Sequence, residues 1–165
     1  MAVKPEYRLA ALLKIRERKK EAAEHYLAEC MKKLKAEVDR LKQMEEELER
    51  MIARRKAKAR EYAEKTMRGE MSAQDAVSAN LFIDRLKELE EAQKNAIEGQ
   101  KAVVAQREED VKGARSDLVK AEQELKALEK HKEKWLEQVK KEAEAKQEEI
   151  QDEVAQRIFM DQEKK

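Results

Sequence analysis

The side chains most able to do chemistry in this chain are His25, Cys30 and His131. Imidazole and thiolate groups bind zinc, but a structural site needs four ligands and a catalytic site three. Cys30 follows His25 by little more than one helical turn, and His131 lies far along the chain. Two neighbouring ligands do not make a zinc site, so we expect a buried thiol, a surface imidazole and no bound metal.

Catalytic motifs are also missing from the sequence. It contains no glycine-rich phosphate loop, and paired acids such as Glu148 and Glu149 are typical of an ordinary helix surface. If the chain forms a rod of two long helices, as its heptad spacing and single turn indicate, it cannot bring Ser, His and Asp together and lacks a concave, water-excluding pocket. We therefore expect no enzymatic activity and no cofactor.

Composition indicates long helices. Of 165 residues, 45% are charged and only 4% are aromatic, while glycine occurs three times and proline once. Such usage is typical of coiled coils, with a core no more than one side chain deep. Lys and Arg total 38 against 37 acids, so the basic runs Lys14–Lys20 and Arg54–Arg60 are interpreted as solvated helix faces and not as a nucleic-acid site.

Cysteine count and hydropathy set the expected compartment. Cys30 is the single cysteine, so no intrachain disulfide can form, which suits a reducing environment. Apolar runs stay far below the ~18 residues needed to cross a bilayer, and the N-terminus lacks a signal core. We expect a cytoplasmic protein with no direct membrane insertion.

Heptad spacing predicts the first helix, over about residues 6–68. Its clearest stripe alternates steps of four and three, as in a coiled-coil seam. The members of this stripe are Leu27, Met31, Leu34, Val38, Leu41, Leu48 and Ile52.

A turn is expected at about residues 69–72. Gly69 can take the left-handed conformation that ends a helix. Ser72 can cap the next helix, with Asp75 three positions later to complete a capping box. The fold class is therefore all-α: two long helices in an antiparallel coiled-coil hairpin, in a single domain covering residues 1–165.

The second helix is predicted over about residues 73–163, longer than the first. Phe82, Leu86 and Leu89 begin its stripe, whereas Ile97 and Val104 continue it one step out of phase. We therefore expect the seam to shift face near Gln93–Ile97.

Counting outward from residue 70 predicts which residues lie opposite each other. Tyr7 should face residue 133 and meet Trp135, which leaves residues 140–165 without a partner in the chain. This extension would project about 40 Å at 1.5 Å per residue. Its apolar residues Ile150, Val154, Ile158, Phe159 and Met160 favour docking into another protein.

Three segments resemble a known family. They are YRLAALLKIR at residues 7–16, NLFIDRL at residues 80–86 and HKEKWL at residues 131–136. Together they resemble the small stalk proteins of bacterial type III secretion systems and of the flagellar export apparatus, the YscO and FliJ group. The third segment, followed by a Lys/Glu/Gln-rich stretch, resembles the injectisome branch.

This resemblance implies a mechanism. Its members form an antiparallel coiled coil whose joined helix ends insert into a hexameric secretion ATPase. The hairpin links that ring to the cytoplasmic domain of the export gate protein, and some members handle secretion chaperones. The protein would then be peripheral to the inner-membrane secretion apparatus.

Carried over residue by residue, the resemblance implies two contact sets. The ATPase-binding set comprises Tyr7, Leu9, Leu12, Leu13, Ile150, Val154, Ile158 and Phe159. The gate-binding set comprises Phe82, Ile83 and Leu86. Flagellar members carry tyrosines on the first helix facing this second set, whereas this chain has Arg54, Arg55 and Lys58 there.

Other functions remain open at this point. A generic coiled-coil scaffold, such as a homodimer of extended chains, would show the same heptads. A stalk subunit of a rotary ion-translocating ATPase shares the hairpin, but the short chain, with no additional domain, argues against this class. An RNA-binding helical arm fits least well, because the charges balance.

Overall fold

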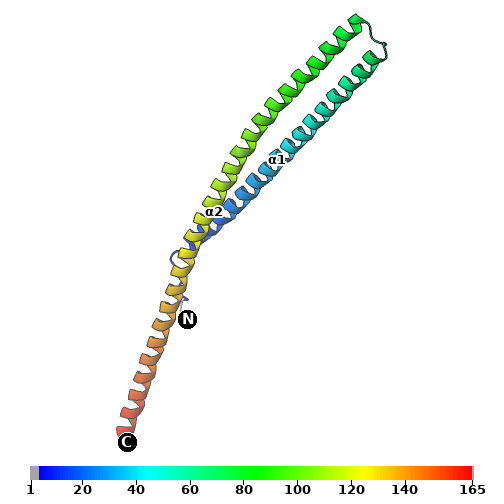
Figure 1. Cartoon of the computed structure of the whole chain (residues 1–165). Coiled ribbons are helices and arrows are strands. Elements are labelled where there is room, and N and C mark those ends of the chain that lie inside the picture. Colours follow the sequence, from blue (N-terminus) through cyan, green and yellow to red (C-terminus); the bar gives the residue numbers. More distant parts are fainter. Residues whose placement is uncertain (1–3, 165) are drawn as a thin grey trace. The chain divides into compact units, whose positions relative to one another are not determined.

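The computed structural model describes residues 4–164 of the chain. These residues form two long α-helices, α1 (Ala10–Met67) and α2 (Ala73–Glu163), joined by a short turn (Figure 1). The helices pack against each other in antiparallel directions, and no strand occurs within this part of the chain. The predicted all-α hairpin with a longer C-terminal helix is confirmed. Residues 1–3 and 165, which the predicted domain includes, lie outside the described residues.

The turn uses the residues that the sequence predicted. Gly69 has a φ of 71°, and its N–H donates to the Thr66 carbonyl at 3.1 Å while the Glu70 N–H donates to the Lys65 carbonyl at 3.0 Å. This pair of bonds is a Schellman motif, which ends α1. The Ser72 N–H then donates to the Asp75 carboxylate, and the Asp75 N–H donates to the Ser72 hydroxyl, each at 3.1 Å. This reciprocal capping box starts α2.

The first helix starts later than predicted, at Ala10 and not near residue 6. Residues 6–9 offer no Ser, Thr, Asp or Asn to cap a helix. Instead, the Ala10 N–H donates to the Tyr7 carbonyl at 3.1 Å in a turn. Tyr7 lies in this non-helical segment and its side chain is buried. The free energy gained by burying the ring therefore outweighs that of one more turn of helix.

The seam of α2 follows one unbroken heptad. Every position in alternating steps of four and three, from Ala79 to Val139, is buried or half-buried. The predicted shift of face near Gln93–Ile97 is therefore wrong. Glu90 is buried and Leu89 is exposed. The prediction followed apolar residues only, so it missed the seam positions that polar residues occupy.

The seam of α1 follows the same alternating steps of four and three. The predicted stripe departs from it by one residue at Met31 and at Val38. Cys30 is buried and Glu37 half-buried in seam positions, whereas Met31 and Val38 beside them are exposed. A regular heptad brings its own positions to the partner helix, whatever residue type occupies them. No large side chain within residues 4–164 is fully buried, which confirms the expected thin core.

Contacts divide the chain into two units. One unit is Tyr26–Arg115, which contains the turn and the core cluster of Cys30, Val111 and Ala114. The other combines the residues up to His25 with those from Ser116 onward. In this second unit Tyr7 contacts both His131 and Trp135, so the opposition of Tyr7 to residue 133, predicted by counting from the turn, is confirmed.

Candidate functional site

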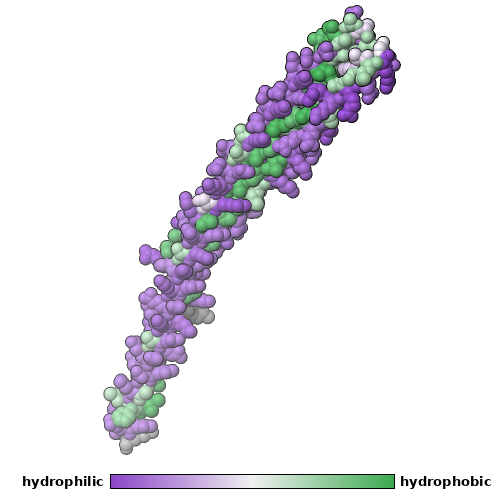
Figure 2. All heavy atoms as spheres, in the orientation of Figure 1, coloured by the Kyte–Doolittle hydropathy of each residue, from purple (hydrophilic) through white to green (hydrophobic). Residues whose placement is uncertain are grey.

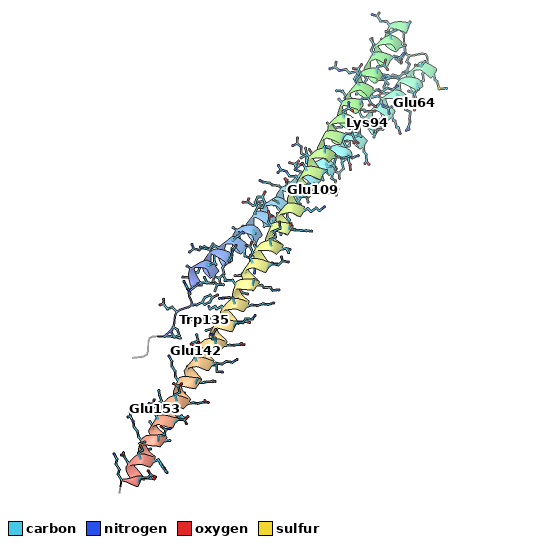
Figure 3. All side chains as sticks on the ribbon, turned by 90° about the vertical axis from the view of Figure 1, so that its left-hand side faces the viewer. Glu64, Lys94, Glu109, Trp135, Glu142 and Glu153 are labelled. Carbon is cyan, nitrogen blue, oxygen red and sulfur yellow. The ribbon has the colours of Figure 1, made fainter. Side chains whose placement is uncertain are left out.

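An aromatic clasp holds the N-terminal segment against α2. The Tyr7 ring lies 5.2 Å from the Trp135 ring and 5.8 Å from the His131 ring, measured between centroids. Its hydroxyl is 2.6 Å from His131 Nδ1. Figure 3 labels Trp135 on α2 beside the N-terminal segment. Tyr7 is only 8% exposed, so this predicted ATPase-binding residue is used to close the clasp.

An ion-pair cluster supports the clasp farther along α1. Glu124 accepts from Arg16 at 2.6 Å and from Lys19 at 3.0 Å. The hydrogen bond from Lys19, aided by the charge of Arg16, holds the pKa of Glu124 below its usual value. Leu9, Leu12 and Leu13 are half-buried between these two sets of contacts. Among the N-terminal residues predicted to bind a partner, Tyr7 thus packs on α2 and the three leucines are half-buried.

The C-terminal part of α2 presents a different surface. All residues described beyond Val139 are exposed, and Figure 2 shows apolar side chains gathered at this end of the helix. Ile150, Val154 and Ile158 repeat every four residues on one side, and Phe159 and Met160 add apolar area near the end. These five side chains are 49–62% exposed. They form a stripe that no part of residues 4–164 covers, which we call the C-terminal stripe.

The helix around the C-terminal stripe is rich in acids. Residues 142–163 contain eight acids against Lys146 and Arg157, a net charge of −6, and the flanking Lys140, Lys141, Lys164 and Lys165 reduce the net charge of residues 140–165 to −2. Figure 3 shows two of the acids, Glu142 and Glu153, extending from the helix. The helix therefore suits a partner that offers an apolar recess together with basic groups.

The two halves of the predicted ATPase-binding set lie apart along α2. Trp135, which marks the clasp, precedes Ile150 by 15 residues, or about 22 Å of helix. A partner that touches both would have to bind along this length. The predicted contacts themselves involve a second protein and stay predictions.

At the turn, the residues predicted to bind the export gate belong largely to the seam. Phe82, Ile83 and Leu86 are half-buried, and Phe82 meets the Tyr62 ring edge-on at 6.4 Å. The sequence analysis placed only Arg54, Arg55 and Lys58 opposite this set and missed Tyr62, the α1 residue whose ring contacts Phe82. Val77 and Leu81, which are 60% and 64% exposed, occupy the outer face of α2 near the turn. Val77 and Leu81 belong neither to the apolar stripe predicted for this helix nor to its observed seam, so their heptad positions could have identified them as exposed.

The candidate metal ligands do not converge. His25 is exposed, Cys30 packs against Val111 and Ala114, and His131 is engaged by Tyr7. Among residues 4–164 the structure brings together no group of three or more His, Cys, Asp or Glu that could hold a metal ion. Neither helix, over the same residues, is long and apolar enough to cross a membrane.

These features define the class of protein: an antiparallel coiled-coil hairpin of two long α-helices. The chain matches the YscO-like protein family over residues 4–165 and belongs to that family. The resemblance drawn from its three sequence segments is thereby confirmed.

A solved structure shows the same fold. It is that of a proposed YscO homologue, CT670, from Chlamydia trachomatis, with a TM-score of 0.82 and 23% sequence identity. The alignment covers 98% of this chain and 99% of that chain. Comparison with curated proteins gave no significant match.

Proposed function

We propose that this protein is a non-enzymatic central-stalk component of a bacterial type III secretion apparatus. Its helix ends insert into a hexameric export ATPase, and its turn links that ring to the export gate. The protein then works in the cytoplasm, beside the inner-membrane apparatus. Membership of the YscO-like family supports the secretion role.

The C-terminal stripe is the observation that carries the ATPase contact. The five apolar side chains of this stripe are each about half exposed or more, which is unfavourable in water. No other part of the described chain covers them. A narrow basic channel would bury the stripe while its charges meet the acids of residues 142–163. The clasp contributes by holding the N-terminal segment on the same helix.

Truncation after Val139 tests this contact. Because residues 140–164 are all exposed, loss of the segment beyond Val139 should leave the unfolding transition of the remaining hairpin unchanged. Binding to the export ATPase of the same secretion system, measured by calorimetry or surface plasmon resonance, should disappear. Binding as tight as that of the full chain would refute the proposal.

Point variants separate the apolar stripe from mere helix length. I150S/V154S/I158S removes the three stripe residues that repeat every four positions, while Q151S/A155S/Q162S changes the neighbouring side of the same helix. All six residues are exposed. We expect the first variant to lose ATPase binding and the second to retain it.

The turn is proposed as the gate contact. Phe82, Ile83 and Leu86 shape this end from within the seam, whereas Val77 and Leu81 are exposed enough to touch a partner directly. V77S/L81S should therefore weaken binding to the cytoplasmic domain of the gate protein without altering ATPase binding. Unchanged gate binding would exclude this surface.

A further inference from the structure

Polar and charged residues recur among apolar ones in the seam of the unit Tyr26–Arg115. A coiled-coil seam is normally apolar, and a polar seam residue lowers stability while it specifies how helices pair. We call six of these residues the polar seam: Glu37 and Arg55 on α1, and Glu90, Gln93, Gln100 and Arg107 on α2. Two of these, Glu90 and Gln100, are among the most buried residues of the chain.

An ion pair joins the helices on the turn side of this region. Arg55 Nε donates to Glu90 Oε1 at 2.7 Å, and the Glu90 side chain is only 6% exposed. A carboxylate so deeply buried needs an opposite charge beside it, because removing the partner leaves an uncompensated charge. Within the hairpin, Arg55 meets this need.

Two glutamines make a second kind of contact. The Gln93 side-chain amide donates to the Met44 carbonyl at 3.0 Å, and that of Gln100 donates to the Glu37 carbonyl at 3.0 Å and to the Glu37 carboxylate at 2.6 Å. Both donors and both acceptors are spaced by seven residues, in opposite chain directions. The contacts therefore repeat with the heptad only when the helices are antiparallel and in this register.

The same residues would conflict in the rival arrangement, a parallel dimer of two extended chains. In a parallel dimer each seam position faces its own copy. Glu90 would face Glu90, Arg55 would face Arg55 and Glu37 would face Glu37. Like charges brought together in a partly buried seam repel each other, and the Arg55–Glu90 pair of the hairpin would be lost.

We infer that the polar seam directs α1 and α2 to pair antiparallel in this register and rejects parallel pairing with a second copy. The Schellman motif and the capping box fix the reversal locally. The polar seam excludes the competing partner along the helices.

Cys30 provides a direct readout of this choice. It is the only cysteine and lies in the seam, packed against Val111 and Ala114. A parallel dimer would place two Cys30 side chains together, so mild oxidation would join the chains covalently. For the native full-length chain we expect a monomer by sedimentation equilibrium and no Cys30-linked dimer. A Cys30-linked dimer of the native chain would overturn the inference.

A seam variant tests whether the polar residues are responsible. E37L/R55L/E90L/Q100L makes the region apolar, and we expect a Cys30-linked dimer on oxidation, at least tenfold more abundant than in the native chain. The matched control D39L/K56L/E88L/E98L adds four leucines at exposed positions of the same stretches and should remain monomeric. The inference fails if the seam variant stays monomeric, or if the control dimerises equally.

A charge exchange tests the antiparallel pairing should the leucine variant aggregate. E90R places two guanidinium groups together and should lower the thermal unfolding midpoint by several degrees. R55E/E90R restores an opposite pair and should recover most of that loss as a monomer. No recovery would show that the pair does not direct the pairing.

Discussion

Replacing Tyr7 with alanine removes the side chain that joins the N-terminal segment to α2. Tyr7 is 8% exposed and contacts Trp135 and His131, so nearly its whole ring is withdrawn from water. An aromatic side chain buries about 200 Å², which at about 25 cal/mol per Å² gives about 5 kcal/mol as an upper limit. Denatured chains bury part of that area already, so we expect a loss of about 3 kcal/mol.

The hydroxyl and the ring can be separated by a second variant. Y7F keeps the packing on Trp135 and removes only the hydrogen bond to His131 Nδ1. A hydrogen bond of this kind contributes about 1 kcal/mol, so Y7F should lie between Y7A and the native chain. Glu6→Ala, at an exposed neighbouring position, serves as the control and should change nothing.

Trp135 gives the assay, because it is the only tryptophan in the chain. Its fluorescence should shift to longer wavelength in Y7A, and urea unfolding followed at this residue should begin at lower concentration. Hydrogen exchange should show faster exchange in residues 10–25. Native-like emission and an unchanged urea midpoint in Y7A would refute the clasp.

Three further predictions concern the turn, the glycines and salt. Hydrogen bonds from the Ser72 backbone N–H and then from its hydroxyl hold the pKa of Asp75 below its ordinary value, so Asp75 stabilises the turn above pH ~4 and this contribution is lost as pH falls through the folded-state pKa. NMR titration should show this low pKa, and S72A should raise it part of the way; an Asp75 pKa at its ordinary value would contradict the capping box. At Gly99 and Gly113 an added Cβ meets no atom within 4 Å, so G99A and G113A should each stabilise the helix by about 0.5–1 kcal/mol in thermal unfolding, and destabilisation would reveal an overlooked contact. Binding of the export ATPase through the acidic residues 142–163 should weaken as salt rises from 50 to 300 mM, and a salt-independent affinity would exclude charge pairing there.

Local sequence signals were sufficient for the helices and the reversal. Gly69, Ser72 and Asp75 act through bonds to residues within a few positions, so their roles follow from residue type and spacing. The register of the clasp then followed by counting, because an antiparallel helix pair keeps one rise per residue on both sides.

The phase of the seam could not be obtained by following apolar residues. Met31 and Leu89 are larger and more apolar than the seam residues Cys30 and Glu90 beside them, yet the structure exposes the former and buries the latter. Glu90 is acceptable in the seam only because Arg55 lies across from it, which is a tertiary fact. A strict heptad drawn through every position, including polar ones, would have found the correct phase.

The candidate site was predictable only in part. The C-terminal stripe is a local helical pattern, and the structure leaves it exposed as a sequence of this kind implies. The bond between Tyr7 and His131 joins residues 124 positions apart, and neither residue type announces the other. The partners themselves lie outside the chain, so their recognition has to be measured.

The glutamine contacts also affect what sequence comparison can reveal about this fold. Gln93 binds the backbone carbonyl of residue 44, and every amino acid supplies that carbonyl. Residue 44 can therefore change type without breaking the bond, and no compensating change at position 93 is required. Methods that detect contacts from paired substitutions would miss this one, although it helps to set the alignment of the two helices.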